Sequence, residues 1–565
     1  MNSNKIFIYQ ALPRLLGNTN DTNKPNGNIE ENGSGKLKDI SAKFLNTLKR
    51  SGYTHIWLIG VLAHASKTDY TKFGIPQEHP EIIKGNAGSP YAIRDYYDID
   101  PDLAVNVNKR MDEFEATVER IHKSGLKLII DFVPNHVARN YNSINRPSRV
   151  ADFGSRDKKT LAFSASNNFY YLPGQDLNVK AFYHGNNAIT YKESPAKATG
   201  NDAFTAQPSV YDWYETVKLN YGVDYQGGGA KYFDPIPDTW KKMKNILLYW
   251  ASKGTDGFRC DMAEMVPTEF WQWVIPQVKK KHPGILFIAE IYNPTLYRSF
   301  LDNDNFDYLY DKVGLYDVLR DVACGYRPSS DITFALNSVG DIQHKMLNFV
   351  ENHDEQRIAS DFFLKSRDKS EAAMIVTSCI NTNPVMVYFG QELGERGMDE
   401  EGFSGRDGRT TIFDYWSIDT VRRWNNNGKW NNDELTEKEI NLKDFYSKLL
   451  NLCNKESSLR EGKFYDLMFA NYQNTGFDST RQYAFLRGTE EELSLVVANF
   501  SNEEVEITID IPDHAFSFFN LSKKYNFTAF PLLSSFKNKI SFSRQDSIKL
   551  KIEANSGEIY NVSGL

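Results

Sequence analysis

The stretch LKLIIDFVPNH, from Leu126 to His136, decides the fold because it joins an apolar strand directly to polar side chains. Its first part, LKLII, is the kind of short apolar run that forms a strand of a parallel sheet. Asp131 ends that run, and Asn135 and His136 follow shortly after. Because a charge at the end of a buried strand is costly to desolvate unless it is paired or used, the stretch predicts a polar site at one edge of a parallel sheet.

Seven further strand-like runs surround this one, and amphipathic helical patterns lie between them. The runs are KIFIYQ from Lys5, THIWLIG from Thr54, GFRCD from Gly257, LFIAEIY from Leu286, FDYLYD from Phe306, MLNFVENHD from Met346 and PVMVYFGQE from Pro384. The helical patterns cover residues 37–50, 109–123, 238–252, 267–281 and 371–380. Eight strands with intervening helices predict an α/β protein with a (β/α)8 TIM barrel.

Two connections are too long for ordinary loops, whose median length is about 4 to 6 residues. The first, after the third strand, is rich in Asn, Ser, Tyr and Gly and has little periodicity. The second runs from Leu393 to about Glu439 after the eighth strand and could cap a cleft. Insertions that follow barrel strands lie on the catalytic face, so both are expected there.

The pattern changes near Leu459 to alternating strands that predict an antiparallel β-sandwich. These strands are QYAFLRG, LSLVVANFS, VEITIDI and SIKLKIEANSGEIYNV. We therefore divide the chain into a barrel (residues 1–136 and 236–457), an inserted domain after the third strand (137–235) and a C-terminal sandwich (458–565).

Composition excludes several classes of protein. The 565 residues include 66 Lys and Arg against 73 Asp and Glu, a net charge of −7, which argues against a nucleic-acid partner. No apolar stretch reaches the roughly 18 to 20 residues of a membrane helix. We find no secretory signal and expect a cytoplasmic protein, unless a signal was removed. The four cysteines are scattered and predict neither disulfides nor a zinc site.

Ionisable side chains stand at the ends of four predicted strands. They are Asp131 on the third, Arg259 and Asp261 on the fourth, Glu290 on the fifth, and His353 and Asp354 on the seventh. In a parallel barrel these ends meet at one face, so the carboxylates are expected to lie close together. Glycoside cleavage needs a carboxylate nucleophile and a protonated carboxylic acid that assists the leaving oxygen. The pattern therefore favours a glycosidase.

These residues resemble the α-amylase family of glycoside hydrolases (family 13). Its four motifs appear in order as DFVPNH (131–136), GFRCD (257–261), the Glu290 of FIAEIY, and ENHD (351–354). The resemblance covers about the first 455 residues, and LVVANFS looks like part of the family's C-terminal domain. It implies a (β/α)8 barrel with a domain inserted after the third strand and a C-terminal β-sandwich. The strand pattern predicts the same layout independently.

The resemblance also implies roles for the three carboxylates. Asp261 is similar to the family's nucleophile, Glu290 to its general acid/base, and Asp354 to a third carboxylate that stabilises the transition state. The family is retaining, so a covalent glycosyl-enzyme intermediate is expected. Arg259, two residues before Asp261 and on the same strand face, is expected to keep the nucleophile ionised.

Further residues are predicted to bind substrate. Arg259 belongs to this set, and His136 and His353 resemble the pair that hydrogen-bonds sugar hydroxyls at the cleavage subsite. The segment SPYAIRDYYDIDP resembles one in which Tyr91 stacks on the sugar ring and Asp95 supports the site.

The resemblance implies that no cofactor is required for the chemistry, although a structural calcium is possible. In many family members the residue matching Asn135 helps to bind calcium, together with an Asp of the inserted domain and the backbone of a His four residues after the nucleophile. Here that last position is Met265, and no Asp partner stands out. Asn135 is therefore a possible calcium ligand.

The leading hypothesis is a retaining hydrolase of α-1,4-glucosidic bonds in starch-derived glucans or maltooligosaccharides. A transglycosidase, an α-glucosidase or an α-1,6-acting enzyme would use the same machinery. An inactive glucan-binding scaffold is a remote alternative, because such proteins usually lose one of the carboxylates and all three are present here. Linkage preference, endo or exo action and oligomeric state stay open.

Overall fold

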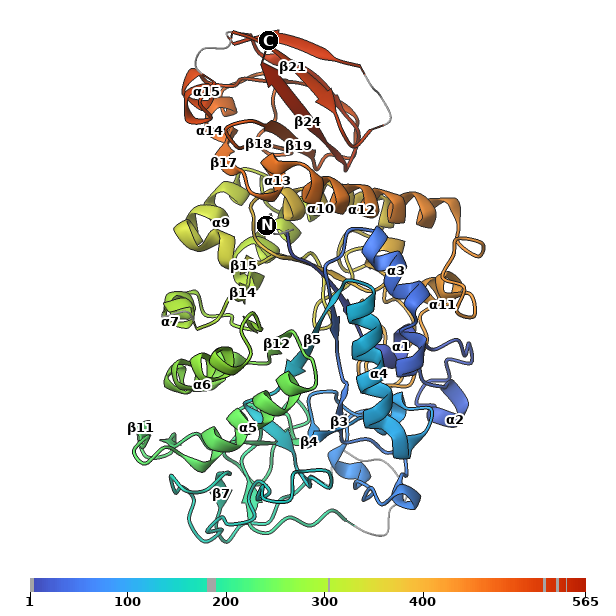
Figure 1. The fold of residues 1–565 in the computed structure, drawn as a ribbon, viewed down its shortest axis with the longest axis vertical. Helices are drawn as coiled ribbons and strands as arrows, with labels where there is room; N and C mark the ends of the chain where they lie inside the picture. The colour runs from blue at the N-terminus through green and yellow to red at the C-terminus, as the bar shows by residue number, and fades with distance from the viewer. Residues whose placement is uncertain are drawn as a thin grey trace.

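The computed structural model describes residues 5–179, 190–302, 305–521, 525–534, 538–544 and 546–564. A barrel of parallel strands lies at the centre, a C-terminal antiparallel sheet lies at one end, and irregular segments with short strands lie at the other (Figure 1). The irregular segments belong to the first long connection. The barrel therefore lies between this connection and the C-terminal sheet.

Eight parallel strands form the barrel. They are β1 (Phe7–Ala11), β2 (His55–Leu58), β5 (Lys127–Phe132), β12 (Gly257–Cys260), β13 (Leu286–Ala289), β14 (Tyr308–Tyr310), β15 (Met346–Leu347) and β16 (Val385–Tyr388). They pair in chain order, and β16 pairs with β1. Between β15 and β16, Asn348 N donates to Pro384 O over 3.0 Å and Met386 N donates to Asn348 O over 2.9 Å. These bonds join the ends of the sheet, so the predicted (β/α)8 barrel is confirmed.

Five helices fall within the predicted helical patterns. They are α3 (Ala42–Arg50), α4 (Arg110–Lys123), α5 (Asp238–Ser252), α6 (Thr268–Lys281) and α10 (Glu371–Cys379). The pattern predicted over 37–50 is broken, because Ser41 caps α3 by accepting from Phe44 N over 3.3 Å and only a short 3-10 turn precedes it. The helices α7 (Tyr297–Leu301), α8 (Asp317–Cys324) and α9 (Asp331–Val339) were not predicted.

Short antiparallel pairs form on the side of the barrel where strands end. The pair β3 (Leu62–His64) and β4 (Ile93–Ile99) follows β2. Between β5 and α5 lie the pairs β6 (His136–Ala138) with β9 (Thr216–Lys218), β7 (Tyr171–Leu172) with β8 (Ala196–Lys197), and β10 (Val223–Asp224) with β11 (Ala230–Lys231). The limits 137–235 for an inserted domain stay a proposal, and residues 180–189 within them lie outside the described residues.

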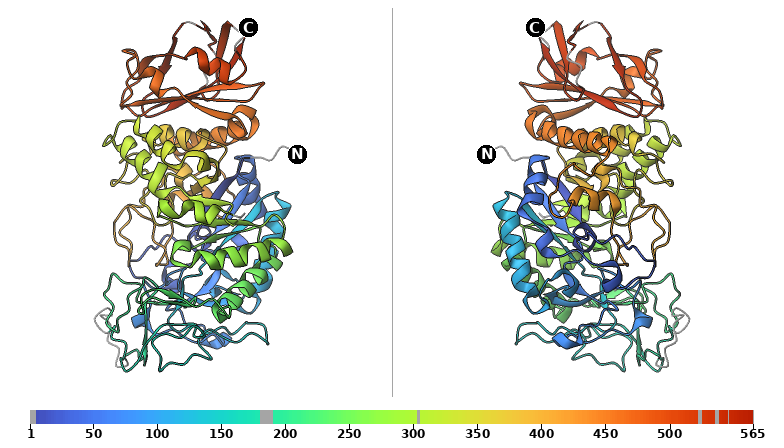
Figure 2. Two further views of the ribbon diagram at one scale, coloured as in Figure 1. Left: turned by 90° about the vertical axis from the view of Figure 1, so that its left-hand side faces the viewer. Right: turned by 90° about the vertical axis from the view of Figure 1, so that its right-hand side faces the viewer.

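The C-terminal part follows α12 (Glu437–Lys455) and α13 (Ser457–Arg460). One antiparallel sheet has the order β17 (Lys463–Asp466), β18 (Gln482–Gly488), β19 (Leu493–Asn499), β24 (Gly557–Gly564), β21 (Asn526–Pro531) and β22 (Ile540–Ser543). A second sheet pairs β20 (Val505–Ile509) with β23 (Ile548–Ile552). Figure 2 shows these strands stacked above α12, and the predicted β-sandwich is confirmed. Of the helices in the described ranges, none has the length and apolar character to cross a membrane.

Candidate active site

Arg259 is the centre of a buried group of carboxylates at the ends of three neighbouring strands. Its side chain is fully buried on β12. Its Nη1 lies 2.7 Å from Asp261 Oδ1 and 3.2 Å from Asp131 Oδ1, and its Nη2 lies 2.7 Å from Glu290 Oε2. Asp261 and Glu290 therefore both contact the same guanidinium group, which holds the two carboxylates close together.

The strand register explains why these side chains meet. Arg259 pairs with Asp131 on one side and with Ile288 on the other. Asp261 and Glu290 each come two residues after a member of that row, and side chains two residues apart leave a strand on the same face. The barrel therefore directs all of these side chains toward its interior at the carboxyl ends of the strands.

Asp354 lies at the rim of the group, in the loop after β15. Its side chain is 41% exposed, whereas those of Asp261 and Glu290 are 8% and 4% exposed. Its Oδ2 lies 3.0 Å from His353 Nε2. Asp354 is thus the carboxylate through which the site opens to solvent.

The second long connection covers the loop that carries Asp354. Arg357 N donates to Gly408 O over 2.7 Å, and Gln356 Nε2 donates to Asp407 O over 2.9 Å. This contact agrees with the expectation that the connection caps the site.

Burial raises the pKa values of the carboxyl groups, and the single Arg259 guanidinium opposes this rise for several of them at once. Burial is the largest effect on Asp261 and raises its pKa well above the ordinary value, with Glu290 and Asp131 adding to the rise and Arg259 opposing it. Burial likewise raises the pKa of Asp131 to about 6. The pKa of Asp354 is also raised, although its exposure lets solvent screen the effect. The expected lowering by Arg259 is present but is outweighed by burial.

Tyr91 and His353 form one side of the site. Their rings stack with centroids 5.4 Å apart, and Tyr91 Oη lies 2.5 Å from His353 Nε2. Gln10 Nε2 lies 3.0 Å from His353 Nδ1, to which it can donate. Burial and the charge of Arg259 hold the pKa of His353 well below its usual value. The ring is therefore neutral and can offer its Nε2 proton to Asp354 or to Tyr91.

His136 lies behind Tyr91. Its ring donates to the backbone carbonyl of Tyr91, and Asn135 Nδ2 lies 3.2 Å from its Nδ1. Burial and nearby lysines lower its pKa to about 3, so the ring is neutral. Because both ring nitrogens contact the protein, His136 fixes the position of Tyr91.

Asp95 is a predicted site residue that lies outside the carboxylate group. It lies on β4 and is fully buried. Its carboxylate accepts from Tyr97 N over 2.8 Å, from the Ser143 hydroxyl, from Ile144 N over 2.7 Å and from Asn145 N over 3.1 Å. Asp95 therefore holds the first long connection against β4 and supports the site from a distance.

Asn135 does not fit the role of a metal ligand. Its Oδ1 accepts from Lys218 Nζ over 2.7 Å, and its Nδ2 donates to Gly200 O over 2.7 Å. Lys218, 1% exposed on β9, also contacts Asp202 Oδ1 at 2.6 Å. Within the described parts of the chain, no group of three or more His, Cys, Asp or Glu residues could hold a metal ion. The amide oxygen thus faces a fixed positive charge of the protein itself.

Sequence reasoning missed several residues of the site. Trp57 Nε1 donates to Asp131 Oδ2 over 3.0 Å, and the rings of Trp57 and Tyr310 lie 5.4 and 5.5 Å from the Arg259 guanidinium. The hydroxyl of Tyr292 donates to Glu290 Oε1 over 2.6 Å. Tyr292 comes two residues after Glu290, and this strand periodicity is a signal that could have identified it.

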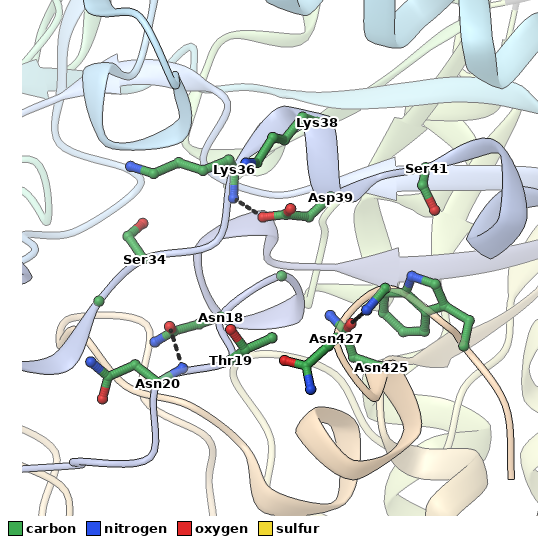
Figure 3. A pocket seen from close by; sticks show the side chains of 14 residues that line it. Asn18, Thr19, Asn20, Ser34, Lys36, Lys38, Asp39, Ser41, Asn425 and Asn427 are labelled. Atoms are coloured by element: carbon green, nitrogen blue, oxygen red, sulfur yellow. Dashed lines mark hydrogen bonds between the residues drawn. The ribbon is translucent and has the colours of Figure 1, made fainter. Parts of the chain in front are cut away.

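A cavity of about 560 Å³ lies apart from this group, between the segment after β1 and the end of α11 (Asp419–Asn425) (Figure 3). Asn18 and Asn427 are among its lining residues. Its one acidic lining residue, Asp39, accepts from Lys36 N over 2.8 Å. With a single carboxylate it cannot supply the pair that glycoside cleavage requires.

A (β/α)8 barrel with buried carboxylates around one arginine at its carboxyl-terminal face defines a glycoside hydrolase. The chain belongs to the α-amylase family, because the family model "Alpha amylase, catalytic domain" matches residues 10–461. This match confirms the resemblance seen in the motifs. Enzymes of this family need no cofactor for catalysis.

Known proteins similar to this chain include α-amylases and a neopullulanase. The chain is 24% identical over 480 residues to Alpha-amylase 3 of Dictyoglomus thermophilum, with 82% of each chain covered. It is 21% identical over 528 residues to Neopullulanase 2 of Thermoactinomyces vulgaris, covering 90% of this chain and 72% of the other. A solved structure of a maltogenic α-amylase from Thermotoga neapolitana is 20% identical, covers 99% of both chains and has a TM-score of 0.63. This likeness confirms the fold.

Proposed function

We propose that the chain hydrolyses α-1,4-glucosidic bonds in starch-derived glucans or maltooligosaccharides with retention of configuration. In this proposal Asp261 is the nucleophile, Glu290 the general acid/base and Asp354 the carboxylate that stabilises the transition state. The observation that carries it is the shared contact of Asp261 and Glu290, from neighbouring strands, with the Arg259 guanidinium. Two carboxylates held together in this way can act on one glycosidic bond.

The two oxygens of Asp261 support its role as nucleophile. Oδ1 accepts from Arg259 Nη1 over 2.7 Å, whereas Oδ2 is buried and has no hydrogen-bond partner in the described part of the chain. We propose that this oxygen, which no donor of the described residues engages, bonds to the anomeric carbon once substrate reaches it. In the first step that bond forms as the glycosidic bond breaks, and Glu290 protonates the leaving oxygen. In the second step water attacks the anomeric carbon, Asp261 leaves, and Glu290 takes the proton.

Neutral and aromatic groups support a sugar substrate. We propose that Tyr91 packs against a glucose unit, that Asp354 accepts from its hydroxyls, and that the buried His353 turns its Nε2 proton from Tyr91 and Asp354 to a sugar hydroxyl when substrate binds. Arg259 acts by orienting the carboxylates, and His136 acts by holding Tyr91. The net charge of −7 favours an uncharged polymer over nucleic acid as the partner.

Maltoheptaose digestion, followed over time by chromatography, tests the proposal. We expect early products shorter than the substrate, with the newly formed reducing ends in the α configuration by NMR. Early mixtures of many lengths would indicate endo action, and a single short product would indicate exo action. Products of the β configuration would overturn the retaining mechanism, and products mainly longer than seven glucose units would overturn simple hydrolysis.

A second candidate activity is hydrolysis of pullulan or cyclomaltodextrins. It is favoured by the similarity to Neopullulanase 2 and by 21% identity over 500 residues to a Cyclomaltodextrinase of a Bacillus species, covering 87% of this chain and 72% of the other. Relative rates on pullulan, a cyclomaltodextrin and soluble starch under one set of conditions separate the two. A rate on either alternative substrate well above that on starch would replace the leading proposal.

We also propose that Lys218, rather than calcium, links the end of β5 to the first long connection. Lys218→Met is expected to lower the free energy of unfolding by about 2 kcal/mol, because Asn135 Oδ1 loses its donor while the half-exposed Asp202 can turn to solvent. EDTA is expected to leave the melting temperature of the unmodified protein unchanged. Thermal and denaturant unfolding measure both effects.

Lys231→Met is the matched control, because Lys231 forms an exposed ion pair with Glu269 and such pairs contribute at most about 1 kcal/mol. A melting temperature that falls in EDTA and returns with added calcium would overturn the proposal for Lys218.

A further inference from the structure

The carboxyl group of Glu290 uses its two oxygens differently. Oε2 accepts the backbone N–H of Met262 over 2.7 Å and lies 2.7 Å from Arg259 Nη2. Both neighbours can only donate, so a proton on Oε2 would face two donors. The acid form must therefore carry its proton on Oε1, whose partner is the Tyr292 hydroxyl at 2.6 Å.

The Tyr292 hydroxyl suits both states of that oxygen, because a phenol can donate and accept. It donates to Oε1 when Glu290 is ionised and can accept from Oε1 when Glu290 is protonated. Burial and the charge of Glu290 raise the pKa of Tyr292, so the phenol keeps its own proton. The hydroxyl can thus adapt to each step without becoming charged.

The backbone around Tyr292 is held by Glu264. Glu264 Oε2 accepts from Tyr292 N over 3.2 Å and from Asn293 N over 3.0 Å. Ala263 N, next to Glu264, donates to Glu290 O over 3.0 Å. These bonds connect the loops after β12 and β13, so Tyr292 is fixed relative to the carboxylates on both strands.

The backbone at Met262 supports the same interpretation. Met262 has φ 43° and ψ 45°, a left-handed conformation that costs a non-glycine residue about 1 kcal/mol. In this conformation its N–H donates to Glu290 Oε2. The strained residue thus helps to leave Oε1 and Tyr292 as the pair that handles the proton.

We propose that Tyr292 is a positioning residue that orients the proton-bearing oxygen of Glu290 and marks the leaving-group side of the site. The proposal rests on the proposed role of Glu290. In the first step the Oε1 proton turns from Tyr292 to the glycosidic oxygen and is transferred as the bond to the anomeric carbon breaks. Tyr292 then donates to the Oε1 carboxylate until water delivers its proton there.

Tyr292→Phe tests the proposal. With maltooligosaccharides kcat/KM is expected to fall about tenfold while KM stays within about twofold, because the acid is less well aligned. The basic limb of the pH profile of kcat/KM is expected to move upward by about half a unit, since a donor to the carboxylate is lost. With an α-glucosyl fluoride, whose leaving group needs little protonation, kcat/KM should change less than about twofold.

Tyr297→Phe is the matched control. The Tyr297 hydroxyl is buried and has no hydrogen-bond partner among the described residues, so its removal should alter neither rate nor pH profile. Glu264→Ala removes the acceptor of the Tyr292 backbone N–H and should change kcat/KM and the pH profile as Tyr292→Phe does. It replaces Tyr292→Phe in the test if Tyr292→Phe folds poorly.

The outcomes separate this inference from the proposed function. Unchanged kcat/KM and an unchanged pH profile in folded Tyr292→Phe would overturn the role of Tyr292 alone, provided that Glu290→Gln is impaired. Equal losses on both substrates with no shift of the pH profile would also overturn it, because they indicate general damage to the site. Full activity of Glu290→Gln would overturn the proposed function as well.

Discussion

Asp261→Asn is expected to lower kcat on maltooligosaccharides by about 10⁴-fold or more, because an amide cannot form the covalent intermediate. The amide oxygen can still accept from Arg259, so the geometry around Glu290 is retained. Reducing-sugar release at high enzyme concentration measures the residual rate. A loss of less than about a hundredfold would contradict the assignment of Asp261 as the nucleophile.

The same variant should be more stable than the unmodified protein at neutral pH. The pKa of Asp261 in the folded state is raised above its unfolded value of about 3.8, chiefly by burial. The protonated Asp261 therefore contributes its full stabilisation of the folded state below about pH 4. This contribution is lost as the pH rises from there through the folded-state pKa. Asn does not ionise, so the gain in the free energy of unfolding should be near zero at pH 4 and should grow as the pH rises to 8.

Denaturant unfolding at several pH values checks this expectation and shows that the inactive variant is folded. A gain that is largest at low pH would contradict the conclusion that burial disfavours the ionised nucleophile.

Glu290→Gln is expected to have the second largest effect, with a loss that depends on the leaving group. General acid catalysis contributes typically about 10²- to 10⁴-fold, so kcat/KM on maltooligosaccharides should fall by that factor. An α-glucosyl fluoride needs little protonation, so its glycosyl-enzyme should still form at a rate close to normal. Added azide, which needs no general base, should then release the intermediate as the α-glucosyl azide.

Asp256→Asn provides a control carboxylate at the opposite end of β12. Asp256 Oδ2 accepts from Leu128 N over 2.8 Å and lies 2.8 Å from His122 Nε2, at the amino end of the strand. Residues at the amino-terminal face of a (β/α)8 barrel stabilise the fold and do not take part in catalysis. The activity of Asp256→Asn should therefore be unaffected. Equal losses on the fluoride and on maltooligosaccharides, without azide rescue, would contradict the role of Glu290 as acid/base.

Much of the fold was predictable because its signals are local. Each barrel strand is a short apolar run, and helices such as α5 carry an amphipathic pattern of their own. The helix α7 was missed because its five residues have too few turns for a clear period. Length does not explain why α9 was missed, because α3 and α10 are also nine residues long and were predicted. Strands β17, β21 and β22 were missed because the four to six residues of each show weak alternation.

The candidate site was predictable in part. Asp261, Glu290 and Asp354 stand at strand ends, and the barrel's closure brings strand ends together. Asp95 stands in a segment that looked equally polar, but its charge is satisfied by backbone N–H groups of a remote connection. Such a partner depends on how a long irregular segment returns to the barrel, and no local pattern encodes that path.

The sequence by itself therefore determined the barrel, the C-terminal sandwich and the identity of the carboxylates, because these depend on residues near one another in the chain. Only the tertiary structure decided which groups each carboxylate contacts. It left Asp261 Oδ2 free, brought Tyr292 to Glu290 Oε1 and filled the space beside Asn135 with the ammonium of Lys218. Hydrogen bonds require distances within a few tenths of an ångström between side chains, and these are fixed only when the whole barrel and its connections have packed.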